Sequence, residues 1–230
     1  MARERIGIAG GMGPLAGVHL QRLIIDATPA KKDQDHLEVV CYTNPMVPDR
    51  TASLKEDEGR FFVRGIKETL EVLRAARATL GVIPCITSHA RFLEISRISP
   101  LPLLNVVELT EKKTADMLGR NARVLVLATD GTVSEKVFER GKSMYCVYLS
   151  REKQRELMDI IYEIKRENNV SRGEERLAAL LDSEALKSID AVIFGCTELS
   201  LCFDRVSKDV DVPAFDPLRI AAEEIVKRCS

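Results

Sequence analysis

Two cysteines occupy matching positions in the chain and define the chemistry that the sequence could support. Cys85 ends an apolar, strand-like run that begins at residue 82, and Cys196 ends a similar run that begins at residue 192. Thr87 and Thr197 follow, and a helical pattern begins close behind each. The carboxyl end of a strand, beside a helix N-terminus, is where α/β proteins place reactive groups and where the pKa of a thiol is lowered. The pair therefore predicts two reactive thiols that face each other across a cleft.

Two thiols on opposite faces of a substrate carbon permit a two-base proton transfer. One removes a proton as thiolate and the other delivers a proton as thiol, which inverts a stereocentre without a cofactor. A free cysteine has a pKa of about 8.5, so helix N-termini and nearby cations must raise its thiolate fraction at pH 7. The hydroxyls of Thr87 and Thr197 could help to stabilise the intermediate carbanion, or each could instead cap the following helix.

The other cysteines indicate neither a disulfide framework nor a metal site. The chain has six cysteines, an even number, but it is long and their spacing is irregular. We therefore expect inert roles for Cys41, Cys146 and Cys229. No C-x2-C or H-x3-H pair is present, so we expect no metal.

The composition excludes several classes of partner. The 230 residues are 45% apolar and 30% charged, which is typical of a globular protein. Lys and Arg (34) nearly balance Asp and Glu (35), so we expect no nucleic-acid or anionic-membrane partner. No apolar run approaches the length of a transmembrane helix, and residues 1–5 lead directly into a strand without a signal-peptide pattern. We expect a cytoplasmic protein.

Strands and helices alternate along the first half of the chain and must position Cys85. The expected elements are a strand at 5–10, a helix at 14–27, a strand at 37–42, a helix at 59–78, a strand ending at Cys85, a helix at 87–96 and a strand at 100–107. Alternation of this kind predicts a parallel sheet with helices on both faces.

The second half repeats this order and must position Cys196. The expected elements are a helix at 108–118, strands at 122–128 and 144–149, helices at 133–141, 151–165 and 173–186, and a strand at 189–195. We predict an α/β fold of two pseudo-symmetric three-layer α/β/α lobes with mainly parallel sheets and the active-site cleft between them. Residues 1–107 and about 213–230 form the first lobe, and residues 108–212 form the second.

Two loops of the first half could bind anions. Residues 11–16 fit the loose dinucleotide pattern G-x-G-x-x-A. That fingerprint also needs an acidic residue at the end of the second strand, but the nearby Asp33 and Asp35 lie before this strand. An anion site without nucleotide specificity fits better. Arg50 lies in segment 43–51, which two prolines keep non-helical. Its guanidinium could bind a carboxylate, or it could instead pair with Asp49 or a loop carbonyl.

Seven ordered segments resemble those of the aspartate/glutamate racemase family, the cofactor-independent amino-acid racemases. They are residues 6–16, 28–36, 44–51, 84–89, 128–132, 161–165 and 195–198. The resemblance covers essentially the whole chain and is closest to the aspartate racemase branch. It implies two pseudo-symmetric α/β lobes, a small-molecule amino-acid substrate, no cofactor and a homodimer.

The resemblance also implies roles for individual residues. Cys85 and Cys196 correspond to the two acid/base residues, and Arg50 and Lys165 to residues that bind the substrate carboxylates. Glu198 would tune or orient Cys196. The residues that would line the pocket are Met12, Thr87, Thr129, Thr132 and Thr197.

One position departs from the family pattern. Ile86 stands where the family has an asparagine after the first cysteine, and a lost buried hydrogen bond costs about 1–3 kcal/mol. The leading hypothesis is racemisation of aspartate or glutamate by Cys85 and Cys196. The alternatives are an isomerase or racemase of the maleate or hydantoin type, and a catalytically silent dicarboxylate-binding protein.

Overall fold

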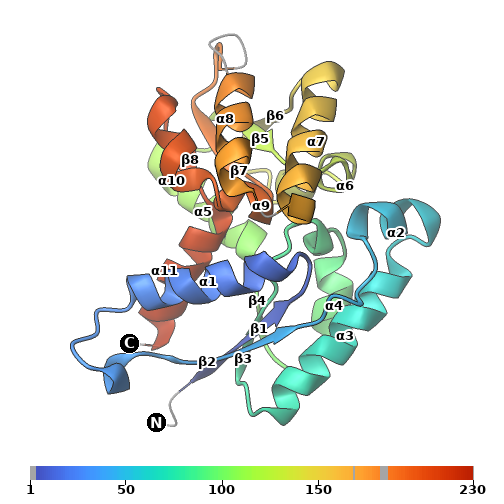
Figure 1. The fold of residues 1–230 in the computed structure, drawn as a ribbon, viewed down its shortest axis with the longest axis vertical. Coiled ribbons are helices and arrows are strands. Elements are labelled where there is room, and N and C mark those ends of the chain that lie inside the picture. The colour runs from blue at the N-terminus through green and yellow to red at the C-terminus, as the bar shows by residue number, and fades with distance from the viewer. Residues whose placement is uncertain (1–3, 168, 182–185, 230) are drawn as a thin grey trace. The chain divides into compact units, whose positions relative to one another are not determined.

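The chain folds into two compact units, each built on its own parallel sheet. The computed structural model describes residues 4–167, 169–181 and 186–229. One unit comprises Met1–Val106 and Leu218–Ser230, and the other comprises Val107–Pro217. Figure 1 shows the chain as it runs through the first unit, through the second, and back to the first in helix α11. These features confirm the predicted fold class of two α/β lobes.

The first unit has a four-stranded parallel sheet of order β2-β1-β3-β4. Its elements are β1 (Arg5–Gly10), α1 (Pro14–Ala27), η1 (Asp33–Asp35), β2 (Glu38–Thr43), α2 (Arg50–Glu56), α3 (Arg60–Ala75), β3 (Leu80–Val82), η2 (Thr87–Arg91), α4 (Phe92–Ile98), β4 (Leu103–Leu104) and most of α11 (Pro217–Cys229).

Helices cover both faces of the first sheet, as neighbouring residues of β1 show. A Cβ added to Gly7 would meet the side chain of Leu73 on α3, at 3.3 Å. The next residue, Ile8, faces the other way and lies close to Gly17 of α1. Side chains alternate between the faces of a strand, so α3 and α1 cover opposite faces. The apolar positions of α3 recur every three or four residues, and this stripe forms its buried side.

The second unit repeats the same sheet order, β6-β5-β7-β8. Its elements are α5 (Val106–Leu118), β5 (Arg123–Leu127), α6 (Asp130–Ser134), η3 (Val137–Glu139), β6 (Tyr145–Val147), α7 (Arg151–Glu167), α8 (Val170–Leu180), β7 (Ala191–Phe194), α9 (Thr197–Ser200), α10 (Phe203–Val206), η4 (Ser207–Asp209) and β8 (Ala214–Phe215).

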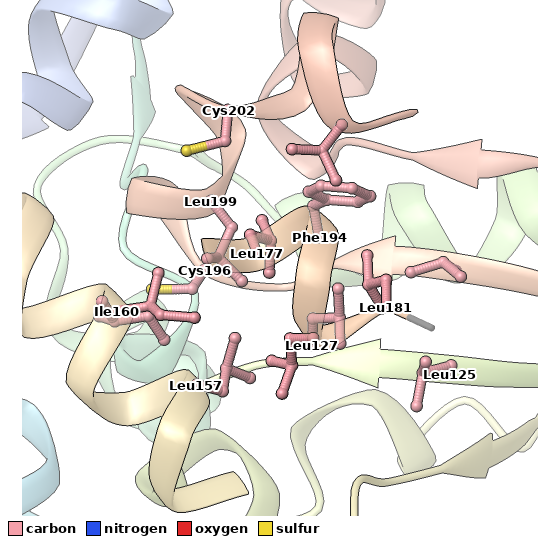
Figure 2. Packing of buried hydrophobic residues seen from close by; sticks show 14 of the residues in the cluster. Leu125, Leu127, Leu157, Ile160, Leu177, Leu181, Phe194, Cys196, Leu199 and Cys202 are labelled. Carbon is pink, nitrogen blue, oxygen red and sulfur yellow. The ribbon is translucent and has the colours of Figure 1, made fainter. Parts of the chain in front are cut away.

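Helices α7 and α8 form the core of the second unit with one face of its sheet. Figure 2 shows Leu125, Leu127 and Phe194 of the strands beside Leu157 of α7 and Leu177 of α8. All of these side chains are buried. The same cluster includes Cys196 and continues into α9 and α10, so the cysteine segment is anchored in the core.

The matching sheet orders place the two cysteines at corresponding points. Cys85 follows β3, the strand on one side of β1, and Cys196 follows β7, the strand on the same side of β5. Each cysteine therefore lies just beyond the carboxyl end of an inner strand. This position was expected from the two apolar runs.

Several boundaries differ from those expected from the sequence. Residues 213–217, expected in the first lobe, lie in the second unit, because β8 pairs with β7, whereas the chain from Leu218 belongs to the first unit as expected. Helix α2 begins at Arg50, inside the segment expected to be non-helical, because the prolines precede it. The helix expected at 133–141 is α6 and η3 instead. The helix expected at 173–186 begins at Val170, and its last part lies outside the described residues.

Candidate active site

In the first unit, Cys85 is fixed through its backbone carbonyl. Its side chain is buried, with 6% exposed. Ser88 donates a hydrogen bond from Oγ to the Cys85 carbonyl at 2.6 Å, and Nδ1 of His89 donates to the same oxygen at 3.0 Å. The His89 ring stacks on Phe92, with centroids 5.2 Å apart. These contacts hold the peptide after β3 in one conformation and so fix the base of the thiol side chain.

Ile86 and Thr87 follow Cys85 in the chain and are both buried. Ile86 is the N-cap residue of η2, and Thr87 is its first residue. The Thr87 hydroxyl therefore does not cap the helix, which removes one of its two expected roles. Ile86 places hydrocarbon next to Cys85, where an amide would offer hydrogen-bonding groups.

The glycine loop after β1 packs tightly against the end of β2. Gly11 has φ +103°, and an added Cβ would lie 2.2 Å from the carbonyl oxygen of Asn44. Met12 follows and is buried in the core of the first unit. Pro14 then begins α1, where its missing N–H costs nothing. The loop therefore approaches the backbone at Asn44 closely, and its expected role as an anion site stays a prediction.

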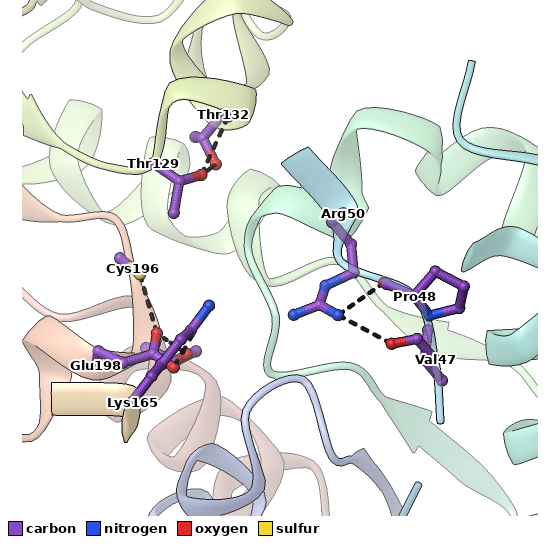
Figure 3. A network of polar contacts seen from close by, with 9 residues as sticks. Val47, Pro48, Arg50, Thr129, Thr132, Lys165, Cys196 and Glu198 are labelled. Carbon is purple, nitrogen blue, oxygen red and sulfur yellow. Dashed lines mark hydrogen bonds and ion pairs between the residues drawn. The ribbon is translucent and has the colours of Figure 1, made fainter. Parts of the chain in front are cut away.

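Arg50 is buried and contacts the loop that precedes it. Its Nη1 donates to the carbonyl oxygens of Pro48 at 2.8 Å and Val47 at 3.3 Å (Figure 3). Asp49 is engaged elsewhere, since its carboxylate accepts from the N–H of Ala52 and caps α2. Of the alternatives left open by the sequence, the contact with loop carbonyls is therefore present. A carboxylate-binding role for the guanidinium stays a prediction.

In the second unit, Cys196 contacts a carboxylate directly. Its Sγ donates to Oε2 of Glu198 at 3.1 Å (Figure 3). Oγ1 of Thr197 donates to the same oxygen at 3.0 Å. Nζ of Lys165, on α7, lies 3.9 Å from the other carboxylate oxygen, Oε1. The structure thus brings together four residues that the sequence had identified, and Thr197, like Thr87, is not a helix cap.

This environment favours the neutral thiol form of Cys196. Burial raises the pKa of its thiol well above the ordinary value, and the charge of Glu198 raises the pKa further. Lys165 acts in the opposite direction but does not reverse the shift. The hydrogen bond from the Glu198 N–H, at the start of α9, does lower the pKa, but the net shift is upward, so the expectation of a lowered thiol pKa is wrong for Cys196. The pKa is raised because the thiol is buried and faces a negative charge, and a short helix does not offset these two effects.

Helix α7, which carries Lys165, is fixed to α8 by a charged cluster that the sequence analysis missed. Glu163 is buried, and its carboxylate lies 2.5 Å from Nη1 of Arg176 and 2.7 Å from Nε of Arg172. The only sequence signal was a carboxylate at a core-facing position of an amphipathic helix. Nζ of Lys165 also lies 5.4 Å from the ring centroid of Tyr162 on the same helix.

Thr129 and Thr132 form a buried pair of hydroxyls after β5. Thr129 caps α6 by accepting from the N–H of Thr132 at 3.3 Å, and the two Oγ1 atoms are 3.1 Å apart (Figure 3). Gln154 of α7 supports this turn by donating from Nε2 to the Ala128 carbonyl and to Oδ1 of Asp130. The sequence did not identify Gln154, because its partners lie more than twenty residues away in the chain.

Residues 4–167, 169–181 and 186–229 contain neither a membrane-spanning helix nor a metal-binding cluster. No helix there is long and apolar enough to cross a membrane. Within the same residues, no group of three or more His, Cys, Asp and Glu side chains could hold a metal ion.

Comparison with known proteins gives one family. The sequence model of the family described as Asp/Glu/Hydantoin racemase matches residues 9–225. The chain is also similar to the broad specificity amino-acid racemase RacX of Bacillus subtilis (strain 168). The two are 23% identical over 214 residues, which cover 90% of this chain and 91% of the relative.

Solved structures show the same fold. The aspartate racemase of Picrophilus torridus superposes with a TM-score of 0.82 at 25% identity, covering 97% of this chain and 94% of that protein. PH1733 from Pyrococcus horikoshii OT3, described as an aspartate racemase homologue, superposes with a TM-score of 0.76 at 23% identity, covering 98% and 99%. A glutamate racemase from Francisella tularensis, solved with D-glutamate, gives 0.64 at 17%, covering 99% and 81%.

Proposed function

The chain belongs to the Asp/Glu/Hydantoin racemase family, and from that premise we propose that it interconverts the enantiomers of an acidic amino acid, aspartate or glutamate. The family and the names of the relatives support amino-acid racemisation as the general activity. The observation that carries the proposed mechanism is the hydrogen bond from Cys196 to Glu198, because it joins a thiol to a base that can receive its proton.

In the proposed reaction, Cys85 and Cys196 act on opposite faces of one substrate Cα. In one direction the Cys85 thiolate takes the Cα proton, and the resulting carbanion takes a proton from the Cys196 thiol. In the reverse direction Cys196 is the thiolate and Cys85 the thiol. Each cycle breaks one C–H bond and forms another, so no oxidant, reductant or cofactor is consumed. The matching positions of the cysteines beyond β3 and β7 support this assignment.

Glu198 has a specific task in this scheme. Cys196 is a thiol at neutral pH, which suits the step in which it donates a proton. For the opposite step it must become a thiolate while Cys85 becomes a thiol. Oε2 of Glu198, at 3.1 Å, accepts the proton of Cys196 and passes it to solvent, and Cys85 takes a proton from solvent, so that the two cysteines again hold one thiolate and one thiol. Lys165 then lies beside the pair, 3.9 Å from Oε1, and its positive charge favours the thiolate form of Cys196.

The remaining predicted site residues would bind the substrate. We propose that Arg50 and Lys165 bind its two carboxylates, because a dicarboxylic amino acid needs two cations. The hydroxyls of Thr87, Thr129, Thr132 and Thr197 and the Met12 segment would line the pocket. All five of these residues are buried, so each is held in a defined place by its own unit. We further propose that the protein acts as a homodimer, which sedimentation velocity would test.

Exchange of the Cα hydrogen in deuterated water tests the mechanism. Aspartate of either enantiomer should acquire deuterium at Cα as it racemises, and Cys85→Ala or Cys196→Ala should abolish racemisation. Cys146→Ser is the matched control, because Cys146 is another cysteine of the second unit but lies within β6 rather than beyond the end of β7. If the double alanine variant still racemises aspartate, the two-thiol mechanism is wrong.

A second candidate is racemisation of a less polar substrate, favoured by Ile86. This residue is 2% exposed and adjoins Cys85, so it offers hydrocarbon rather than an amide to a bound molecule. A panel of amino acids and hydantoins, assayed for exchange with the wild type and Ile86→Asn, separates the two candidates. A gain of aspartate exchange in the variant, with loss on an apolar substrate, would favour the second.

A further inference from the structure

Asn44 lies at a junction of three segments of the first unit. It directly follows β2, and its backbone N–H donates to the Gly10 carbonyl at 3.1 Å. Its side-chain Oδ1 accepts from the N–H of Met46 at 3.1 Å, and its Nδ2 donates to Oγ1 of Thr69 on α3 at 2.9 Å. The backbone and side chain of this one residue thus join the end of the β1–β2 ladder, the loop at 44–49 and helix α3.

The direction of these hydrogen bonds is fixed by the chemistry of Thr69. Its hydroxyl has a single proton, which it donates to the Gly65 carbonyl one turn earlier, at 2.9 Å. Thr69 is fully buried, so its oxygen can only accept from Asn44. The Asn44 amide must therefore present NH2 to Thr69 and its oxygen to Met46. An aspartate at position 44 has no proton for the first of these bonds.

A second contact holds the same loop against α3. Val47 is buried over Gly65, where an added Cβ would lie 3.3 Å from the valine Cγ2. The carbonyl oxygens of Val47 and Pro48 are the two acceptors of Nη1 of Arg50. The position of the guanidinium therefore depends on a loop whose beginning is fixed by Asn44.

We infer that Asn44 is a positioning residue for substrate binding, and that it acts through Arg50. Its amide, oriented by Thr69, fixes the loop whose carbonyls hold the guanidinium where it meets a substrate carboxylate. This inference rests on the proposed function, because it assigns Arg50 the binding of that carboxylate. Asn44 itself takes no part in proton transfer, so its loss affects KM rather than kcat.

The test removes the Thr69 hydroxyl and compares the effect on KM with the effect of the same substitution at a matched threonine. Thr69→Val should raise KM for aspartate about tenfold, the effect of one lost buried hydrogen bond, with kcat nearly unchanged. Asn44→Asp should also raise KM, whereas Thr69→Ser, which keeps the hydroxyl, should have a KM close to that of the wild type. Thr114→Val is the control, because Thr114 is also buried and donates to the carbonyl one turn earlier, that of Thr110, at 2.8 Å.

A double-mutant cycle with Arg50→Lys tests whether the effect passes through Arg50. The KM effect of Thr69→Val should largely disappear in the Arg50→Lys background, because residues that act as a unit are not additive. A full effect in that background would overturn the inference, as would a KM for Thr69→Val equal to that of Thr114→Val.

Amide hydrogen exchange keeps this inference separate from the proposed function. Thr69→Val should accelerate exchange at Met46 and across residues 44–50, and Thr114→Val should not. Unchanged exchange would overturn the inference whatever the kinetics. If exchange accelerates but Arg50→Lys leaves KM unchanged, the assigned role of Arg50 fails. The loop is then fixed by Asn44 without serving the substrate, and the inference falls.

Discussion

The Sγ atom of Cys196 donates a hydrogen bond to Oε2 of Glu198 at 3.1 Å, inside the buried core of the second unit. The two residues are two positions apart, at the turn from β7 into α9. A carboxylate in this position raises the pKa of the thiol, and in the proposed mechanism it is also the base that deprotonates it. The same contact would therefore oppose the thiolate at rest and provide the route to it during the proposed reaction.

Glu198→Gln should separate these two effects. The amide keeps the size of the side chain but removes its charge, so the pKa of Cys196 should fall while remaining above its ordinary value because of burial. Racemisation should nevertheless slow by about 100-fold, since a general base is lost. Alkylation of Cys196 as a function of pH, followed by peptide mass spectrometry, measures the pKa. Glu156→Gln on the exposed side of α7 is the control, and an unchanged pKa in Glu198→Gln would contradict the prediction.

Lys165→Met should have the opposite effect on the thiol. The charge of the ammonium lowers the pKa of Cys196, so its removal should raise that pKa further. KM for aspartate should also rise by about tenfold or more, because a hydrogen-bonding charge is lost from the substrate site. Steady-state kinetics and the same alkylation experiment measure both quantities. Lys112→Met, on the exposed side of α5, controls for the loss of a lysine; equal behaviour of the two variants would argue against the role of Lys165.

Glu111 should make stability depend on pH. Burial raises the pKa of this α5 carboxyl to about 7, with Glu108 adding to the shift and the Gly141 N–H and Arg140 opposing it. The folded state holds the proton more tightly than the unfolded state. The stabilisation is therefore complete below about pH 4.5 and is lost as the pH rises through about 7.

The measurement is chemical denaturation of the wild type and Glu111→Gln between pH 5 and pH 8. A difference of one pH unit between the folded-state and unfolded-state pKa corresponds to roughly 1.4 kcal/mol in the free energy of unfolding. The wild type should lose free energy of unfolding relative to the variant as the pH rises. Glu152→Gln, exposed on α7, should keep the wild-type slope. Parallel curves for the wild type and Glu111→Gln would show that this carboxyl is not the source.

Gly11→Ala should destabilise the protein far more than Gly119→Ala. Both glycines have positive φ, of +103° and +83°, so both alanines carry the backbone penalty of about 1–2 kcal/mol. At Gly119 an added Cβ meets nothing within 4 Å, whereas at Gly11 it lies 2.2 Å from the Asn44 carbonyl oxygen. Thermal unfolding of the two variants compares them directly. Similar losses would mean that the loop at Gly11 moves aside at little cost.

The sequence predicted well those features that local patterns encode. Apolar runs ended by Cys85 and Cys196 predicted two of the inner strands, and the alternation of strands and helices predicted two parallel sheets. The order of the strands within each sheet came from the structure. The sequence was less accurate where a boundary depends on a distant partner. The strand at Ala214–Phe215 is only two residues long, and its place in the second sheet follows from pairing with β7.

The candidate site shows the same division. The residue types in the two cysteine segments, and the adjacency of Cys196, Thr197 and Glu198, were determined by the sequence alone, because neighbours on the chain must be neighbours in space. The tertiary structure decided the direction of the Cys196 pKa shift, the approach of Lys165 to Glu198, and the bond between Asn44 and Thr69. These depend on burial and on hydrogen bonds between elements far apart in the chain, and such distances are set only when the helices pack onto their sheets.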